Sequence, residues 1–284
     1  MSFRRFVYLV TKDFRRGTFL LRRVDTSRFF FSPKRQMDRL LAYPPPPTEE
    51  GRLPPPTMRF DPPTCDVGNG YLDFMLFPAG DDGNNHKVLV TDLTGRALLY
   101  DPESSPPTVR SLPSFTVPKR SPISFAGGGG GGNNKCVYVL ETYFSHLHNH
   151  YLRSFCFDAY VRGEHGGDWQ CRSLPPPPYA AGDAVVVSYA AGGGSIWASS
   201  SASGGLVDGD GVTYSFDTAS HAWAKVGDWA LPFGGQAHHV PEHGVWLGVS
   251  PSGPSSIAGG VDRSDASVVV CAADLGAGGR GRVE

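Results

Sequence analysis

The chain has 284 residues, of which 40% are apolar and 12% aromatic, and this composition excludes a largely disordered protein. Its 36 glycines and 25 prolines favour many turns and short strands over helices. The formal net charge is −1, and no apolar run approaches the roughly 20 residues that cross a bilayer, so we expect no membrane-spanning helix.

The first predicted element is a hairpin over residues 6–25. The segments F-V-Y-L-V-T (Phe6–Thr11) and T-F-L-L-R-R-V-D (Thr18–Asp25) flank an R-R-G turn. Residues 1–40 carry eleven Lys or Arg against three Asp, which we expect on the solvent side of strands. The alternative is a surface for phosphate, acidic lipid or an acidic partner. An Arg-rich start is also typical of a transit peptide, so organelle import stays open.

A Pro-rich linker is predicted over residues 44–57, after a short helix at Gln36–Ala42. The runs Pro44–Pro47 and Pro54–Pro56 favour an extended surface segment of polyproline type. R-L-P-P-P at Arg52–Pro56 leaves one alternative, a ligand for a Pro-binding module.

A repeat of nearly constant length follows the linker. An apolar run ends at an Asp four times, and the steps between these residues are 57, 59 and 57. The four positions are Tyr100-Asp101, Phe157-Asp158, Phe216-Asp217 and Ala273-Asp274. We expect the aromatic residues to pack between sheets and the Asp side chains to accept N–H groups in turns, which gives the carboxylates no catalytic role.

Each repeat divides into short strands bounded by Gly, Pro, Asn and Asp. The predicted strands are 74–77, 87–91, 96–101 and 108–113; 122–125, 136–140, 152–158 and 169–175; 185–189, 195–199, 212–217 and 222–226; and 237–240, 245–249 and 267–274. Four such strands are typical of a propeller blade. Trp169 and Trp223, in the fourth strand of their units, are expected to fill gaps between blades.

The predicted fold class is therefore all-β and β-propeller-like. We expect one domain over residues 1–284, with blades at approximately 72–115, 120–178, 183–232 and 235–275. The last blade lacks a fourth strand, and the N-terminal hairpin forms a half-blade, so the ring could stay unclosed. In Val212–Phe216, the period of two predicts Val212, Tyr214 and Phe216 on the buried face and Thr213 and Ser215 on the opposite one.

Polar clusters that resemble chemical sites are better explained as loops. His146, His148 and His150 lie in a connection with Glu141 as the nearest carboxylate, and H-H-V-P-E-H at 238–243 is interrupted by Pro241. The Gly127–Gly132 run lacks the G-K-[ST] ending of a phosphate loop, and Gly192–Gly194 predicts a turn. We predict no catalytic, cofactor-binding or metal-binding residues.

The five cysteines are odd in number, widely spaced and never form a C-x-x-C pair, which favours a reducing compartment, cytoplasmic or nuclear.

Several longer motifs carry a resemblance to a known family. They are R-R-F-V-Y-L-V-T-K-D, M-D-R-L, W-Q-C-R-S-L-P-P-P-P-Y, Y-S-F-D-T-A-S-H-A-W-A-K-V-G-D-W-A-L-P-F and H-V-P-E-H-G-V-W-L-G. Together they resemble domain of unknown function 1618, a plant family expanded in grasses that is similar to kelch-type and F-box-associated propellers. The resemblance implies a propeller without established activity, and further strands beyond C-A-A-D-L.

Three functions follow as hypotheses. The first is a non-enzymatic module that binds an unidentified protein partner, without a membrane or nucleic acid as partner and without a cofactor. The second is a truncated product with little independent function, and the third is an enzyme with its site at the propeller channel. Trp229, in D-W-A-L-P-F (Asp228–Phe233), is a second Trp that the other complete units lack after their fourth strand, and it is the one binding candidate.

Overall fold

The computed structural model describes residues 6–25, 52–63, 70–78, 86–128, 135–144, 153–163, 167–202, 211–240, 244–249 and 270–273. Strands dominate these ranges, which confirms the predicted all-β class. None of their helical turns has the length and apolar character needed to cross a membrane. The chain divides into two compact units, the first comprising Met1–Asp92 and Leu98–Arg110, the second Leu93–Ala97 and Ser111–Glu284.

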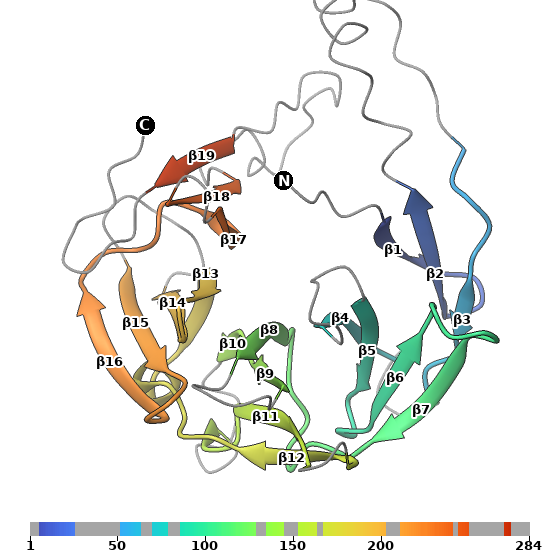
Figure 1. Ribbon diagram of the computed structural model, residues 1–284, viewed down its shortest axis with the longest axis horizontal. Coiled ribbons are helices and arrows are strands. Elements are labelled where there is room, and N and C mark those ends of the chain that lie inside the picture. Colours follow the sequence, from blue (N-terminus) through green and yellow to red (C-terminus); the bar gives the residue numbers. More distant parts are fainter. Residues whose placement is uncertain are drawn as a thin grey trace, which may run out of the picture. The chain divides into compact units, whose positions relative to one another are not determined.

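The first unit begins with a three-stranded sheet of order β1-β2-β3 (Figure 1). The predicted hairpin is present as β1 (Phe6–Asp13) and β2 (Thr18–Asp25). The additional strand β3 (Met58–Phe60) follows the Pro-rich segment and pairs with β2. Of the predicted linker, residues 44–51 lie outside the described residues, and the Arg22 guanidinium donates a hydrogen bond to the Pro54 carbonyl in the described part.

The second sheet of this part of the chain is the first complete blade. Its order is β4-β5-β6-β7, with β4 (Leu72–Pro78), β5 (His86–Asp92), β6 (Ala97–Asp101) and β7 (Thr108–Leu112). These strands match the four predicted ones. Tyr100 is buried and meets Phe60 edge to face, with ring centroids 6.2 Å apart. Burial of such rings is the main stabilising term of this core.

The second unit contains the next blade, of order β12-β11-β9-β8. Its strands are β8 (Ile123–Gly128), β9 (Lys135–Leu140), β11 (Phe157–Arg162) and β12 (Trp169–Ser173). The prediction of a strand at 152–158 was wrong, because residues before 157 form a turn in which the Cys156 amide donates to the Arg153 carbonyl. Asp158 therefore lies inside the sheet, opposite Val139 and Ser173, and forms no turn.

The third and fourth predicted blades form one continuous sheet of order β16-β15-β14-β13-β17-β18-β19. The first four strands are β13 (Ala184–Gly192), β14 (Ser195–Ser201), β15 (Val212–Asp217) and β16 (Ala222–Gly227). The others are β17 (Gly234–Val240), β18 (Val245–Val249) and β19 (Val270–Ala273). Parallel pairing of β13 with β17 joins the two blades, and the short β10 (Tyr143–Phe144) pairs with β13.

Three successive antiparallel meanders of four strands each confirm the propeller-like architecture. The last meander, β17-β18-β19, has three strands in the described residues. Closure of a ring stays a prediction.

Strand β15 has a fully buried residue on each of its two faces. Phe216 and Thr213 are both fully buried, although they belong to opposite faces. Thr213 tolerates burial because its hydroxyl donates to the Trp229 carbonyl at 2.5 Å and lies 2.8 Å from the Ser199 hydroxyl. The Leu231 amide donates to Ser199 as well, at 2.9 Å. The segment D-W-A-L-P-F thus packs on the face of Thr213, opposite to that of Phe216.

Candidate functional site

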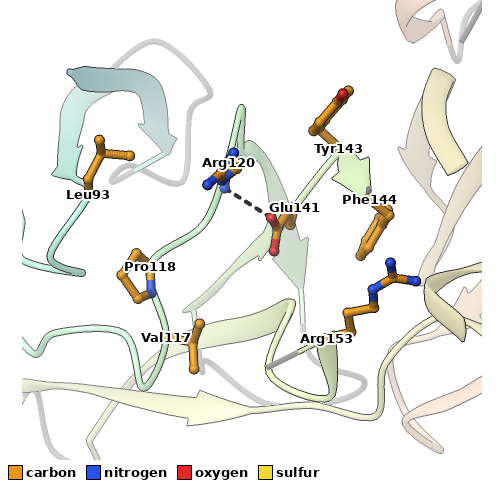
Figure 2. Close-up of a pocket in the computed structure, with 8 residues that line it drawn as sticks. All are labelled: Leu93, Val117, Pro118, Arg120, Glu141, Tyr143, Phe144 and Arg153. Atoms are coloured by element: carbon orange, nitrogen blue, oxygen red, sulfur yellow. Dashed lines mark hydrogen bonds between the residues drawn. The ribbon is translucent and has the colours of Figure 1, made fainter. Parts of the chain in front are cut away.

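A pocket with a volume of about 230 Å³ lies in the second unit (Figure 2). Its lining consists of Leu93, Val117, Pro118, Arg120, Glu141, Tyr143, Phe144 and Arg153. Figure 2 shows the Glu141 side chain in the middle of this set, next to Arg120.

The segment between β7 and β8 positions one side of the pocket. The Phe115 amide donates to the Gly95 carbonyl at 2.9 Å, which anchors the start of this segment. At its end, Ser121 has a φ of 46°, a left-handed conformation that non-glycine residues rarely adopt. The Thr142 hydroxyl donates to the Ser121 carbonyl at 2.6 Å and so ties this strained turn to the residue after Glu141. Backbone strain of this kind often occurs at functional sites.

Glu141 lies directly after β9 and is only 8% exposed. Its Oε1 accepts a hydrogen bond of 3.3 Å from the backbone N–H of Arg120. Burial raises the pKa of this carboxyl to about 7, and it outweighs the opposing effects of that N–H and of the charges on Lys119, Arg120 and Arg153. Glu141 therefore changes charge near neutral pH.

Of the three cations near Glu141, Arg153 and Lys119 form ion pairs with other carboxylates. Arg153 donates to the carbonyls of Ala180 and Gly182 and forms an ion pair of 3.1 Å with Asp183. Lys119 is buried in an ion pair with Asp158 and donates to the Phe155 carbonyl at 2.7 Å.

Arg120 differs from both, because its side chain is exposed and, within the described ranges, forms no ion pair. The pocket consequently offers one buried anion and one solvent-exposed cation without a partner of opposite charge in that part of the chain.

Apolar side chains form the rest of the lining. Leu93 and Tyr143 are 42% and 44% exposed, whereas Phe144 is buried against Tyr179, with ring centroids 5.7 Å apart. An exposed apolar rim around a desolvated carboxyl is typical of a binding site. Glu141 is the one carboxyl among the described residues of the lining. Among the described residues, no cluster of His, Cys, Asp and Glu could hold a metal ion.

Comparison with protein families identifies one that spans nearly the whole chain. The model of the family described as "Protein of unknown function (DUF1668)" matches residues 4–283. The chain belongs to the DUF1668 family. The sequence motifs resembled domain of unknown function 1618, and the matching family carries a different number, so that naming and its plant and kelch-type associations are not confirmed. A search of curated proteins found no match to this DUF1668 chain.

Solved structures similar to the DUF1668 chain include two described as enzyme or propeller. A putative 6-phosphogluconolactonase from Bacteroides uniformis is 14% identical, with a TM-score of 0.47, and the match covers 100% of this chain and 67% of that one. The Dos1 propeller is 14% identical, with a TM-score of 0.38 and coverages of 94% and 62%.

The complex of fission yeast SREBP-SCAP binding domains is 10% identical, with a TM-score of 0.39 and coverages of 95% and 58%. The DUF1668 chain thus spans about two thirds or less of the length of each of these structures. The assignment of blades rests on the strand pairing given above.

The repeat residues of the DUF1668 chain lie outside the pocket. Tyr100, Phe157 and Phe216 are buried, and Trp169 and Trp223 are half-buried on the outer strands β12 and β16. The Trp223 indole N–H donates to the Pro175 carbonyl at 3.0 Å. Asp274 lies outside the described residues.

The repeated Asp residues do not share one role. Asp217 accepts the amides of Ala219 and Ser220 at 3.0 and 2.6 Å, as a turn-forming Asp does. Asp101 accepts the Glu103 amide at 3.1 Å and also pairs with Lys87 at 2.6 Å. Asp158 instead pairs with Lys119 and accepts the Ser173 hydroxyl at 2.7 Å.

Trp229 is half-buried and packs against a small core of Ala190, Leu231, Phe233, Ala237 and Trp246. A Cβ on Gly227 would clash with the Trp229 indole nitrogen, so this glycine permits the close approach of the ring. These contacts give Trp229 a structural role, and its binding role stays a prediction.

The glycine and histidine motifs are only partly described. Gly193 and Gly194, with φ of 57° and 80°, form the predicted turn between β13 and β14. Gly127 and Gly128 end β8. His238 lies in β17, whereas the cluster at 146–150, the residues 241–243 and the helix expected at 36–42 lie outside the described residues.

Sequence reasoning missed the pocket. The available signal was a single acidic residue directly after an apolar strand, in V-Y-V-L-E-T. A single acidic residue after a strand does not by itself indicate a pocket, because the other residues of the lining come from segments far apart in the chain.

Proposed function

We propose that this DUF1668 chain is a non-enzymatic propeller-type module that binds another protein through the pocket around Glu141. The observation that carries the proposal is the exposed apolar rim of Leu93 and Tyr143 around a buried carboxyl. Exposed apolar and aromatic side chains, tyrosine above all, are enriched at the hot spots of protein interfaces, and polar groups beside them supply hydrogen bonds.

The enzyme hypothesis finds less support in this geometry. Glu141 has a pKa in the range of a general acid or base, but the other described residues of the lining are the cations Arg120 and Arg153 and apolar or aromatic side chains. A binding role needs only the shape and charge that the lining provides.

An intracellular location, cytoplasmic or nuclear, belongs to the same proposal. It is supported by Cys136, Cys156 and Cys171, which are free thiols.

Site-specific photo-cross-linking tests the proposal. A photoreactive phenylalanine analogue at position 143 is compared with the same analogue at position 226, because Tyr143 and Val226 are equally exposed, at 44%. We expect cross-linking in extracts of the source organism to give one reproducible adduct at position 143 and none at 226. The adduct partner is then purified, and Tyr143→Ala is expected to weaken its binding about ten-fold or more at unchanged melting temperature.

Equal cross-linking from both positions, or a partner whose affinity is unaffected by Tyr143→Ala and Leu93→Ala, would contradict the proposal.

A further inference from the structure

We propose that the Glu141 pocket accepts a single basic side chain, lysine or arginine, from the protein partner. This inference rests on the proposed function and adds the chemistry of the group that enters the pocket.

The charges around the pocket support a cationic ligand. Glu141 receives one long hydrogen bond of 3.3 Å, from a backbone N–H, and among the described residues no side-chain cation pairs with it. A buried carboxylate is stabilised by a donor of opposite charge, and an ammonium or guanidinium group supplies one.

Two of the three nearby cations oppose such a ligand only weakly, because each forms an ion pair of its own. Lys119 is neutralised by Asp158, and Arg153 by Asp183. The buried Cys156 thiol interacts electrostatically with Glu141, and burial raises the pKa of this thiol to about 12, so it stays neutral at physiological pH. Arg120 is the remaining cation, and its exposed side chain is available to pair with an acidic residue beside the inserted one.

The shape and the lining fit a long basic side chain. Val117, Pro118 and Phe144 offer an apolar wall for its methylene groups. The exposed Tyr143 ring is a suitable neighbour for a cation. With a volume of about 230 Å³, the pocket is smaller than most small-molecule sites, which occupy roughly 300–1,000 Å³, so one side chain is the better match.

An acidic ligand fits less well, because it would bring a second carboxylate against Glu141 inside a desolvated site. The test therefore includes an acidic peptide, and tighter binding of that peptide would contradict the inference.

The test uses blocked pentapeptides with lysine, norleucine or glutamate at the centre, titrated into the full chain and followed by NMR. Norleucine keeps the four-carbon stem and lacks the ammonium group. At pH 8 we expect the lysine peptide to bind at least ten-fold more tightly than the norleucine peptide. Its affinity should fall about ten-fold per pH unit below the pKa of Glu141, because protonation removes the negative charge.

Glu141→Gln should abolish both the lysine preference and the pH dependence. The control Glu103→Gln, at an exposed glutamate of the first unit, should leave both unchanged. The Gln variant at 141 removes a buried charge, so we expect it to fold at least as well as the unmodified chain.

Equal affinity for lysine and norleucine peptides, no measurable binding of either, or tighter binding of the glutamate peptide would overturn the inference. If the position-143 adduct persists in that case, the proposed function stands and only the basic ligand is wrong. Loss of the adduct as well would overturn both.

Discussion

Phe157 and Phe216 lie edge to face, with ring centroids 4.8 Å apart and an interplanar angle of 86°. Phe157 belongs to β11 and Phe216 to β15, so this contact joins two different sheets of the second unit. Both side chains are fully buried, and Trp223 packs 5.1 Å from the Phe216 ring. The aromatic repeat of the sequence therefore provides the packing between sheets.

Phe216→Ala should destabilise the fold by about 3–5 kcal/mol, because it removes a fully buried ring and leaves a cavity between two sheets. Thermal or urea unfolding measures the loss. Phe14→Ala is the matched control, since Phe14 is 85% exposed and its removal should change stability by less than about 0.5 kcal/mol. Similar stabilities of the two variants would show that β15 does not have the register described.

The ion pair of Lys119 and Asp158 should be costly to break from one side. Lys119→Met leaves a fully buried carboxylate with the Ser173 hydroxyl as its remaining partner, and we expect a loss of about 3–5 kcal/mol. The double variant Lys119→Met/Asp158→Leu should recover most of this loss in urea unfolding. Lys225→Met, which breaks the exposed pair with Asp228, should leave the melting temperature unchanged. A double variant as unstable as the single one argues against the pair.

The hydroxyl pair of Ser199 and Thr213 holds the segment after β16 against the sheet. Thr213→Val keeps the shape but removes the donor to the Trp229 carbonyl, and it should cost about 1–3 kcal/mol because that carbonyl and Ser199 lose a partner. Calorimetry provides the measurement, with Thr108→Val as control, because Thr108 makes its hydroxyl contact at an exposed site. Equal effects of the two substitutions would mean that Thr213 is not buried in solution.

Stability should depend on pH through Glu141. Its pKa is raised from 4.5 to about 7 in the folded chain, so the folded state binds more protons than the unfolded state between these values. The contribution is therefore fully present below about pH 4.5 and is lost as the pH rises through 7, amounting to a few kcal/mol. Burial also raises the pKa of Asp73, to about 6. Asp73 therefore makes a second contribution to the stability of the unmodified chain that is also lost as the pH rises.

The difference between the unmodified chain and Glu141→Gln isolates the Glu141 term. We expect the Gln variant to be the more stable of the two at pH 8 and to lose this advantage near pH 5, as measured by urea unfolding at each pH. A difference that stays constant from pH 5 to 8 would contradict the raised pKa.

The strands were predictable where the signal is local. The four strands of the first complete blade follow from short apolar runs bounded by Gly, Pro and Asp, since each such run buries a face and must end in a turn. β3 was not predictable in this way, because three residues are too few to show an alternation.

The nearly equal spacing of the repeat, in steps of 57, 59 and 57 residues, wrongly predicted a turn at Asp158. Asp158 occupies the repeat position of Asp101 and Asp217, but Lys119 pairs with it inside the sheet. Local patterns do not reveal such a partner 39 positions away. Thr213 follows the same principle, because its burial depends on Ser199 and on the carbonyl of Trp229.

The pocket was the least predictable feature. Leu93, Arg120, Glu141 and Arg153 come from four separate segments, and only the fold brings them together. The pKa of Glu141 depends on that burial, which no residue pattern encodes.

The most direct test of the central claim is the pH titration of the Glu141 side-chain carboxyl by ¹³C NMR, with and without the lysine peptide. We expect a pKa of about 7 for this carboxyl in the free chain and a clear decrease when the peptide binds. A carboxyl that titrates near the ordinary value of 4.5 and ignores the peptide would contradict the claim that this pocket holds a desolvated carboxyl ready for a basic partner.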